Sequence, residues 1–175
     1  LKYLLGPAGI AFLYVRRELI ERLEPLPTGW FGRVDPFAFS LNPLDWSPTA
    51  RRFETGSPPV PNAYAALAGL ELLARIDPAA VEAQIARLVQ RFAGGARSRG
   101  FDVATPEAAA ERSSLVVLRS TDAAALVTRL AGRGVIASSR GTGLRVSFHA
   151  YNNEQDVDAV LAALHAGEAA VVAGR

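Results

Sequence analysis

The sequence predicts a chain of mixed helices and strands that ends in a small α+β domain. From about Phe101 onward, the patterned segments follow one another in the order strand, helix, strand, strand, helix. A long amphipathic helix precedes them, with its apolar residues on one face. Hydrophobic residues make up 50% of the 175 residues and charged residues 21%, which is typical of a folded chain rather than a disordered one.

Loops dominate the first part of the chain. Glycine and proline punctuate residues 1–9, and the apolar run I-A-F-L-Y-V at residues 10–15 is typical of a buried strand. Residues 24–61 hold most of the prolines and both tryptophans, so we expect a long irregular segment there. Loops of that length are usually functional. The composition of residues 64–75 predicts a helix.

The long helix has a clear start. Asp77 is placed to cap it, and Pro78 occupies its first turn, where a missing N–H leaves no hydrogen bond unmade. The pair Gly94-Gly95 predicts its end. The residues expected on its apolar face recur at helical spacing: Val81, Ile85, Leu88 and Phe92.

Three strands and two helices are expected after it. The strands are predicted over residues 114–118, 135–137 and 144–148, the last because apolar and polar residues alternate along it. Thr121 is expected to cap the helix that follows the first strand, and Asn153 to cap the final helix. This order is that of a small α+β domain.

Composition argues against several classes of function. The net charge is only +2 and the basic residues are scattered, so no nucleic-acid partner is expected. No apolar run approaches the roughly 18 residues of a membrane span. The chain has no cysteine, which excludes disulfides and thiolate chemistry, and its two histidines form no metal cluster. A cytoplasmic location is therefore expected.

Arg145 is the candidate binding residue that the pattern itself singles out. It lies on the polar face of the strand predicted over residues 144–148. There a planar guanidinium can hold a carboxylate through two parallel hydrogen bonds. The alternative is an ordinary surface salt bridge, which the spacing alone favours.

Four segments, in a fixed order, carry a resemblance to a known family. Residues 2–15 (K-Y-L-L-G-P-A-G-I-A-F-L-Y-V) place a lysine before a Gly/Pro loop and a hydrophobic run. T-G-W-F-G follows at residues 28–32 and R-F-E-T-G-S-P-P at residues 52–59. G-L-R-V-S-F-H-A-Y-N at residues 143–152, followed by D-V-D at 156–158, closes the series. Together they resemble the class V aminotransferase family, whose enzymes use pyridoxal 5′-phosphate (PLP), and the second segment resembles the Gly-Trp element of kynureninases.

The resemblance implies the α/β fold of PLP-dependent transferases of fold type I, in a homodimer. Residues 1–80 would be the end of the large, cofactor-binding domain and would include the lysine loop. Residues 81–100 would be a linking helix, and residues 101–175 the α+β small domain.

Four residues are implied as cofactor ligands. Lys2 would form the internal aldimine with PLP and later move the α-proton of an amino-acid substrate. Gly56 and Ser57 would contact the PLP phosphate, through a backbone N–H and a hydroxyl, in the other subunit. Ser57 stands where the family has Thr and keeps the hydroxyl. Trp30 would lie near the phosphate or the substrate, or would serve as a packing anchor.

Two arginines are implied as substrate ligands. Arg145 would clamp the α-carboxylate of the substrate. Arg140 lies in residues 138–143, which we expect to be a flexible loop, and would assist Arg145 or remain solvated. Tyr151 and Asn152 would fix the turn into the last helix rather than touch the substrate.

The reaction itself stays open between transamination, C–C hydrolysis and epimerisation. Cysteine desulfurases of the family need a cysteine in the loop before the Arg145 strand, and this chain has none. The Gly-Trp and Ser-Pro-Pro elements favour a kynureninase-like or aminotransferase-like enzyme. The chain has no methionine, and most of the family's cofactor domain precedes the lysine. We therefore expect a C-terminal fragment that holds PLP poorly by itself; the alternative is a truncated, non-catalytic remnant that only folds or dimerises.

Overall fold

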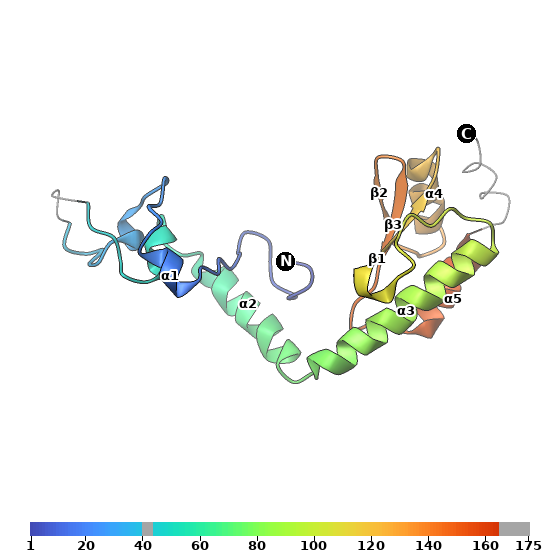
Figure 1. Cartoon of the computed structure of the whole chain (residues 1–175), viewed down its shortest axis with the longest axis horizontal. Coiled ribbons are helices and arrows are strands. Elements are labelled where there is room, and N and C mark those ends of the chain that lie inside the picture. The colour runs from blue at the N-terminus through green and yellow to red at the C-terminus, as the bar shows by residue number, and fades with distance from the viewer. Residues whose placement is uncertain (40–43, 165–175) are drawn as a thin grey trace. The chain divides into compact units, whose positions relative to one another are not determined.

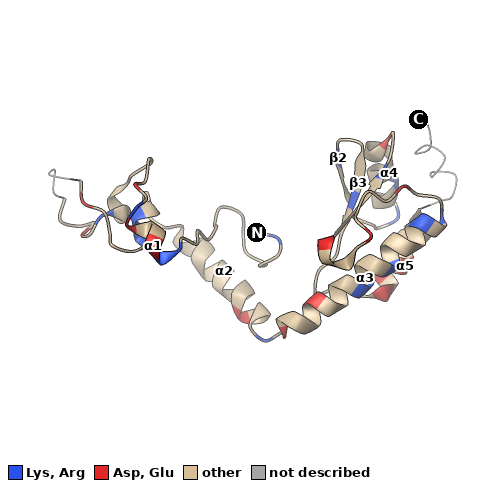
Figure 2. Ribbon diagram, in the orientation of Figure 1, with Lys and Arg blue, Asp and Glu red and all other residues tan. Residues whose placement is uncertain are grey.

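In the computed structural model, the structure describes residues 1–39 and 44–164, which divide into one unit at Leu1–Arg75 and another at Ile76–Arg175 (Figure 1). Each unit has its own helices, and the strands of the described residues all lie in the second. Basic and acidic residues are spread along both units (Figure 2). No helix in the described part of the chain has the length and apolar character needed to cross a membrane.

The first unit consists of loops gathered around short helices. These are α1 (Arg17–Ile20), the 3-10 turns η1 (Trp30–Gly32) and η2 (Ala50–Phe53), and α2 (Val60–Leu73). Helix α2 begins at Val60, earlier than composition predicts and directly after Pro59. Pro61 is tolerated in its first turn, because the N–H that a proline lacks would have no helical partner there.

The strand predicted at residues 10–15 is wrong for this chain. The segment has no strand pairing, and Phe12, Leu13 and Tyr14 are 65%, 67% and 84% exposed. A strand needs a neighbour to accept its backbone hydrogen bonds. Among the described residues of this unit no such neighbour exists, so an apolar, aromatic run is left on the surface.

The second unit is built on α3 (Pro78–Ser98), which Asp77 caps by accepting a hydrogen bond from the Ala79 N–H at 3.1 Å. The prediction that Gly94-Gly95 ends this helix is wrong, since α3 continues for three further residues. A Cβ on Gly95 would lie 2.5 Å from Leu161 Cδ1. The glycine therefore serves a close approach between two helices and not a helix end.

A three-stranded antiparallel sheet follows, in the order β1-β3-β2. Its strands are β1 (Leu115–Arg119), β2 (Ser138–Arg140) and β3 (Gly143–Ser147). The turn η3 (Ala109–Glu111) precedes the sheet, and the helices that accompany it are α4 (Ala123–Ala131) and α5 (Glu154–Ala163). Asn153 caps α5 as predicted, whereas α4 is capped by Asp122 and not by Thr121.

The strand expected at residues 135–137 forms three residues later, and the predicted flexible loop at residues 138–143 is a hairpin. Gly134 has a φ of +76°, and the Val135 N–H donates to the Leu130 carbonyl at 2.9 Å. The backbone N–H of Val135, at the start of the predicted strand, is therefore used in the turn that ends α4. Strand β2 therefore begins at Ser138, and Gly141, with a φ of +53°, lies in the tight turn to β3.

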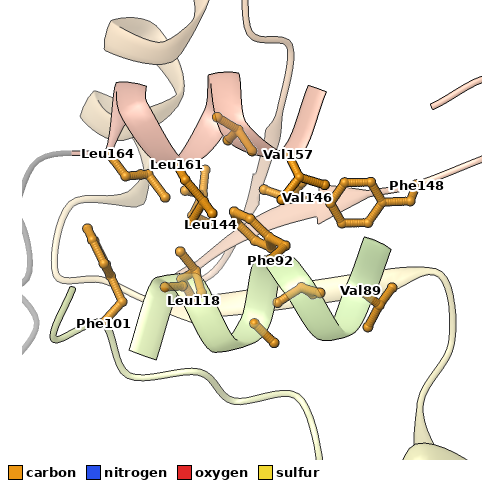
Figure 3. Packing of buried hydrophobic residues seen from close by; sticks show 14 of the residues in the cluster. Val89, Phe92, Phe101, Leu118, Leu144, Val146, Phe148, Val157, Leu161 and Leu164 are labelled. Carbon is orange, nitrogen blue, oxygen red and sulfur yellow. The ribbon is translucent and has the colours of Figure 1, made fainter. Parts of the chain in front are cut away.

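One face of the sheet is covered and the other is open. Leu144 and Val146 of β3 pack in a core with side chains of α3 and α5, among them Phe92 and Val157 (Figure 3). The residues at alternate positions point the other way. They contribute no side chain to the core: Leu115, Val117 and Arg119 of β1, Ser138 and Arg140 of β2, and Gly143, Arg145 and Ser147 of β3. We call this the open face.

Candidate functional site

The loop that carries Lys2 is packed on α2. The Leu5 N–H donates to the Lys2 carbonyl at 3.2 Å, which closes a turn behind the lysine. A Cβ on Gly69 would lie 2.8 Å from the Leu5 carbonyl oxygen, so only glycine lets the loop come this close to the helix. Nearer the start of α2, Asn62 Nδ2 donates to the Ala8 carbonyl at 2.7 Å. The Lys2 side chain itself is exposed.

The second and third sequence segments are packed on each other. A Cβ on Gly29 would lie 1.6 Å from the Thr55 carbonyl oxygen, and one on Gly32 would lie 2.7 Å from the Arg52 carbonyl oxygen. These contacts bring the T-G-W-F-G segment against the backbone of the R-F-E-T segment. The two segments therefore form one structure, and Trp30 lies close in space to the residues that precede Gly56.

Arg52, in the third segment, is a buried structural tie. Its Nε donates to the Ser47 carbonyl at 2.9 Å, and its terminal nitrogen donates to the carbonyls of Ile20 and Leu23. The guanidinium thus joins α1 to the loop before η2. Because its hydrogen bonds go to backbone oxygens, this arginine is not placed to bind an anion.

Gly56 and Ser57 leave room beside them. Apart from its own atoms and those of its chain neighbours, no heavy atom of the described residues lies within 4 Å of the position that a Cβ on Gly56 would take, and its φ is not in the left-handed region. Nothing in the described chain therefore requires a glycine here. Ser57 is exposed, and its hydroxyl makes no hydrogen bond with the described residues. The pair could receive an anion from outside the chain.

Trp30 belongs to an aromatic cluster. Its ring meets Phe31 and Phe37 edge to face, with centroids 4.6 and 5.5 Å apart, and stacks near Phe39 at 6.2 Å. The residue as a whole is 38% exposed. This geometry fits a packing anchor, while the exposed part of the residue leaves it able to contact a ligand.

The segments that carry Lys2 and Gly56-Ser57 approach α2 at different levels. Leu4 and Leu5, next to Lys2, pack at Gly69, whereas Ser57 precedes the helix start at Val60. At 1.5 Å per residue, nine residues of helix separate these two levels by about 14 Å. A four-carbon lysine side chain is much shorter than that.

Arg145 lies on the open face of the second unit and is half-buried. Its neighbours across the sheet are Val117 of β1 and Ser138 of β2, and its Nε donates to Ser138 Oγ at 3.1 Å. No carboxylate in the described part of the chain pairs with it, although Arg33, Arg91 and Arg119 all have acidic partners. A partly desolvated cation without an anion is costly, so such a site favours binding of one.

Arg140 ends β2, opposite Gly143, and is exposed. It shares the open face with Arg145. The hairpin that carries Arg140 is further held by the Ser120 N–H, which donates to the Thr142 carbonyl at 2.7 Å. The two arginines thus lie on one face of the sheet, Arg145 on the middle strand β3 and Arg140 at the end of the edge strand β2.

The closing Y-N…D-x-D segment has a structural role. Asn152 Oδ1 accepts from the His149 N–H at 2.8 Å, and Asp156 accepts from the Asn152 side chain and the Asn153 N–H, both at 3.0 Å. The side-chain hydrogen bond from Asn152, and then that from the Asn153 backbone, hold the pKa of Asp156 below its ordinary value. Asp158 binds Arg91 of α3 through both carboxylate oxygens.

Tyr151 is 72% exposed and stacks on His149 with centroids 4.8 Å apart. Gln84 of α3 donates to the Asn152 carbonyl at 3.2 Å. The turn into α5 is therefore held by the side chain of Asn152 and by Gln84 of α3. The sequence predicts this role for Asn152. In the residues that the structure describes, no three His, Cys, Asp or Glu side chains come together as a metal site.

Three residues that hold segments of the candidate site in place were not predicted from the sequence: Arg52, Asn62 and Ser138. Sequence patterns give no signal for Asn62 or Ser138, since each acts through a contact with a segment distant in sequence. Arg52 did lie within a recognised segment, but its burial and its carbonyl partners follow from the tertiary structure.

Comparison with known proteins gives concordant matches. Residues 2–160 match the family described as aminotransferase class-V. The chain is 32% identical over 156 residues to the uncharacterized aminotransferase YcbU of Bacillus subtilis, covering 89% of this chain and 40% of that protein. It is 32% identical over 139 residues to a kynureninase of Deinococcus radiodurans, covering 77% of this chain and 34% of the relative.

Among solved structures, the apo cysteine desulfurase of Thermococcus onnurineus NA1 superposes with a TM-score of 0.79 at 25% identity. The match covers 95% of this chain and 44% of that one. The chain thus spans 34–44% of the length of these three proteins.

Proposed function

The chain belongs to the aminotransferase class-V family, and on that basis we propose that it contributes to a PLP-dependent site that acts on an amino-acid substrate. The observation that carries the proposal is the half-buried guanidinium of Arg145, which has no acidic partner in the described residues. A carboxylate is the group that all α-amino acids share and that an arginine holds bidentately.

The groups present in the first unit fit PLP. Lys2 is the only lysine among the 175 residues, and its exposed amine is free of acidic partners in the described chain. The space beside Gly56 and the hydroxyl of Ser57 suit a phosphate, since a backbone without a Cβ can approach an anion closely. When bound, PLP supplies an electron sink for negative charge that develops at the substrate Cα.

We assign two tasks to Lys2 Nζ. It would hold PLP as a primary amine, which a guanidinium could not do. Once the amino group of the substrate has displaced it and set it free, the same amine would take the proton from the substrate Cα and return it. The turn that the Leu5 N–H closes on the Lys2 carbonyl, and the contact of that turn with Gly69, support a fixed position for the lysine backbone.

Gly56 and Ser57 are assigned to the phosphate of a second copy of the protein. The separation of about 14 Å along α2 between the helix start and the level at which Leu4 and Leu5 pack, next to Lys2, supports this assignment. A two-fold dimer would then form two equivalent sites at its interface.

Among the reactions of the family, we favour kynureninase-like or aminotransferase-like chemistry. The relatives at 32% identity are an uncharacterized aminotransferase and a kynureninase. Probable cysteine desulfurases are also similar, at 28–30% identity over 175–180 residues and 39% over 59 residues, but this chain has no cysteine to serve as a nucleophile. The alternative, a non-catalytic remnant that only folds or dimerises, predicts no chemistry on any amino acid.

Exchange of the α-proton separates these possibilities without knowledge of the product. The intact protein, supplied with PLP in D₂O, is incubated in turn with L-kynurenine, L-cysteine and L-alanine, and the Cα–H signals are followed by NMR. The proposal predicts loss of the Cα–H signal of at least one amino acid, and no loss with Lys2→Ala. If none of the three amino acids exchanges, the remnant hypothesis is favoured.

A further inference from the structure

Arg145 is held on one side by a neutral residue. Ser138 of β2 is its direct cross-strand partner, and Ser138 Oγ accepts from Arg145 Nε at 3.1 Å. Val117 of β1 is the cross-strand partner on the other side and offers no polar atom from its side chain. The guanidinium therefore lies between a hydroxyl and an apolar side chain.

We propose that Ser138 is a positioning residue that fixes the plane of the Arg145 guanidinium and directs its terminal nitrogens toward a substrate carboxylate. This inference rests on the proposed role of Arg145. A guanidinium has five N–H donors in one plane. With the Nε–H engaged by Ser138, the four N–H groups of the two terminal nitrogens remain, and a carboxylate can bind them end-on with two parallel bonds.

The chemistry of serine suits this task. An Asp or Glu at the same position would orient the guanidinium equally well but would neutralise it, as Asp45 does for Arg33 at 2.7 Å. A hydroxyl accepts the Nε–H and leaves the positive charge available to a ligand. Orientation before binding lowers the entropy lost when a long side chain is immobilised by its ligand.

The environment of Ser138 separates it from an ordinary surface serine. It is half-buried, whereas the next residues of the strand, Ser139 and Arg140, are exposed. Ser139 points to the opposite side of the strand and is paired with Leu144. Ser139→Ala is therefore a matched control, because the same change is made one residue away without touching Arg145.

The test uses the intact protein with PLP and two small probes, L-alanine and ethylamine, which differ only by the carboxylate. Dissociation constants are measured by calorimetry for the unaltered protein and for Ser138→Ala, Ser138→Thr, Ser139→Ala and Arg145→Ala. We expect Ser138→Ala to weaken L-alanine binding by about five- to tenfold, as for the loss of one hydrogen bond, and to leave ethylamine binding unchanged. Ser138→Thr, which keeps the hydroxyl, and Ser139→Ala should both bind as the unaltered protein does.

A second readout follows the arginine directly. In the ¹H–¹⁵N spectrum of arginine side chains, the Nε–H signal lost in Arg145→Ala identifies that group. Its hydrogen exchange should be faster in Ser138→Ala and unchanged in Ser139→Ala. Unchanged L-alanine binding in Ser138→Ala, or an equal loss for both probes, overturns the positioning role. If Arg145→Ala fails to reduce the preference for L-alanine over ethylamine, the proposed function itself is wrong, whatever Ser138 does.

Discussion

A Cβ atom on Gly29 would lie 1.6 Å from the carbonyl oxygen of Thr55, so the backbones of these two residues touch. This contact joins two segments that lie more than twenty residues apart in the sequence. It places the Gly-Trp element and the R-F-E-T-G-S-P-P segment, which contains Gly56 and Ser57, in one structure.

Gly29→Ala should disrupt this packing. The clash is with backbone atoms, which cannot rotate away as a flexible side chain could, so we expect a loss of at least about 2 kcal/mol in unfolding free energy. Urea unfolding followed by tryptophan fluorescence measures it. Gly56→Ala is the control, because its Cβ would meet nothing within 4 Å. Equal stability of Gly29→Ala and the unaltered protein would show that the contact is not made in solution.

Asn62→Ala should loosen the lysine loop. The change removes the hydrogen bond to the Ala8 carbonyl, a contribution of about 1 kcal/mol. Amide hydrogen exchange of residues 3–9 should then become faster, while α3 and the sheet of the second unit keep their protection. Glu71→Gln, an exposed change on the same helix, serves as control. No change in exchange at residues 3–9 would mean that Gly69 alone holds the loop.

Arg145→Ala should raise the KM for the amino-acid substrate and leave PLP bound. Loss of a charged bidentate partner costs about 2–5 kcal/mol when the pair is buried, and Arg145 is only half-buried. An increase in KM of roughly thirtyfold, about 2 kcal/mol, is therefore expected. Arg140→Ala, on the exposed end of the hairpin, should change KM by less than threefold, or about 0.6 kcal/mol. An unchanged KM in Arg145→Ala would identify this arginine as an ordinary surface residue.

Asp156 should make the stability of the second unit depend on pH. Hydrogen bonds from Asn152 and Asn153 lower the pKa of Asp156 in the folded chain. A group whose folded pKa is depressed stabilises the protein above its unfolded pKa, and this contribution is lost as the pH falls through the folded value. The difference in melting temperature between the unaltered protein and Asp156→Asn should thus be present at pH 7 and shrink below about pH 4. A difference that grows as the pH falls would contradict this assignment.

Mixed dimers test the assignment of Ser57 to a second copy. Lys2→Ala and Ser57→Ala proteins should each be inactive or nearly so, since each damages both sites of its own dimer. A mixed dimer places both changes in one site and leaves the other intact, so activity should return to about half per dimer formed. If mixed dimers form and regain no activity, Lys2 and Ser57 of the same chain serve the same site.

The sequence predicted the parts of the fold that local pattern determines. The alternation along residues 144–148 predicts that Arg145 lies on one face of the strand and Leu144 and Val146 on the other. The structure confirms this for β3. Asp77 and Asn153 cap their helices as expected, because a cap depends only on the residues that follow it.

Predictions failed where a distant contact decides the outcome. Gly95 suggested a helix end but accommodates Leu161, and the apolar run at residues 10–15 suggested a strand but has no neighbour to pair with among the described residues. The hydrogen bond from Arg145 to Ser138 depends on strand register, which the local pattern of neither strand specifies.

We propose that Lys2 carries the cofactor, and chemical trapping shows whether it does. The intact protein is incubated with PLP, reduced with borohydride, digested and analysed by mass spectrometry. Because Lys2 is the only lysine of these 175 residues, any label that this chain carries on a lysine side chain must lie there. We expect the mass of one reduced pyridoxyl group on the peptide that contains Lys2, and none in Lys2→Ala. A protein that is saturated with PLP and labelled only outside that peptide would contradict it.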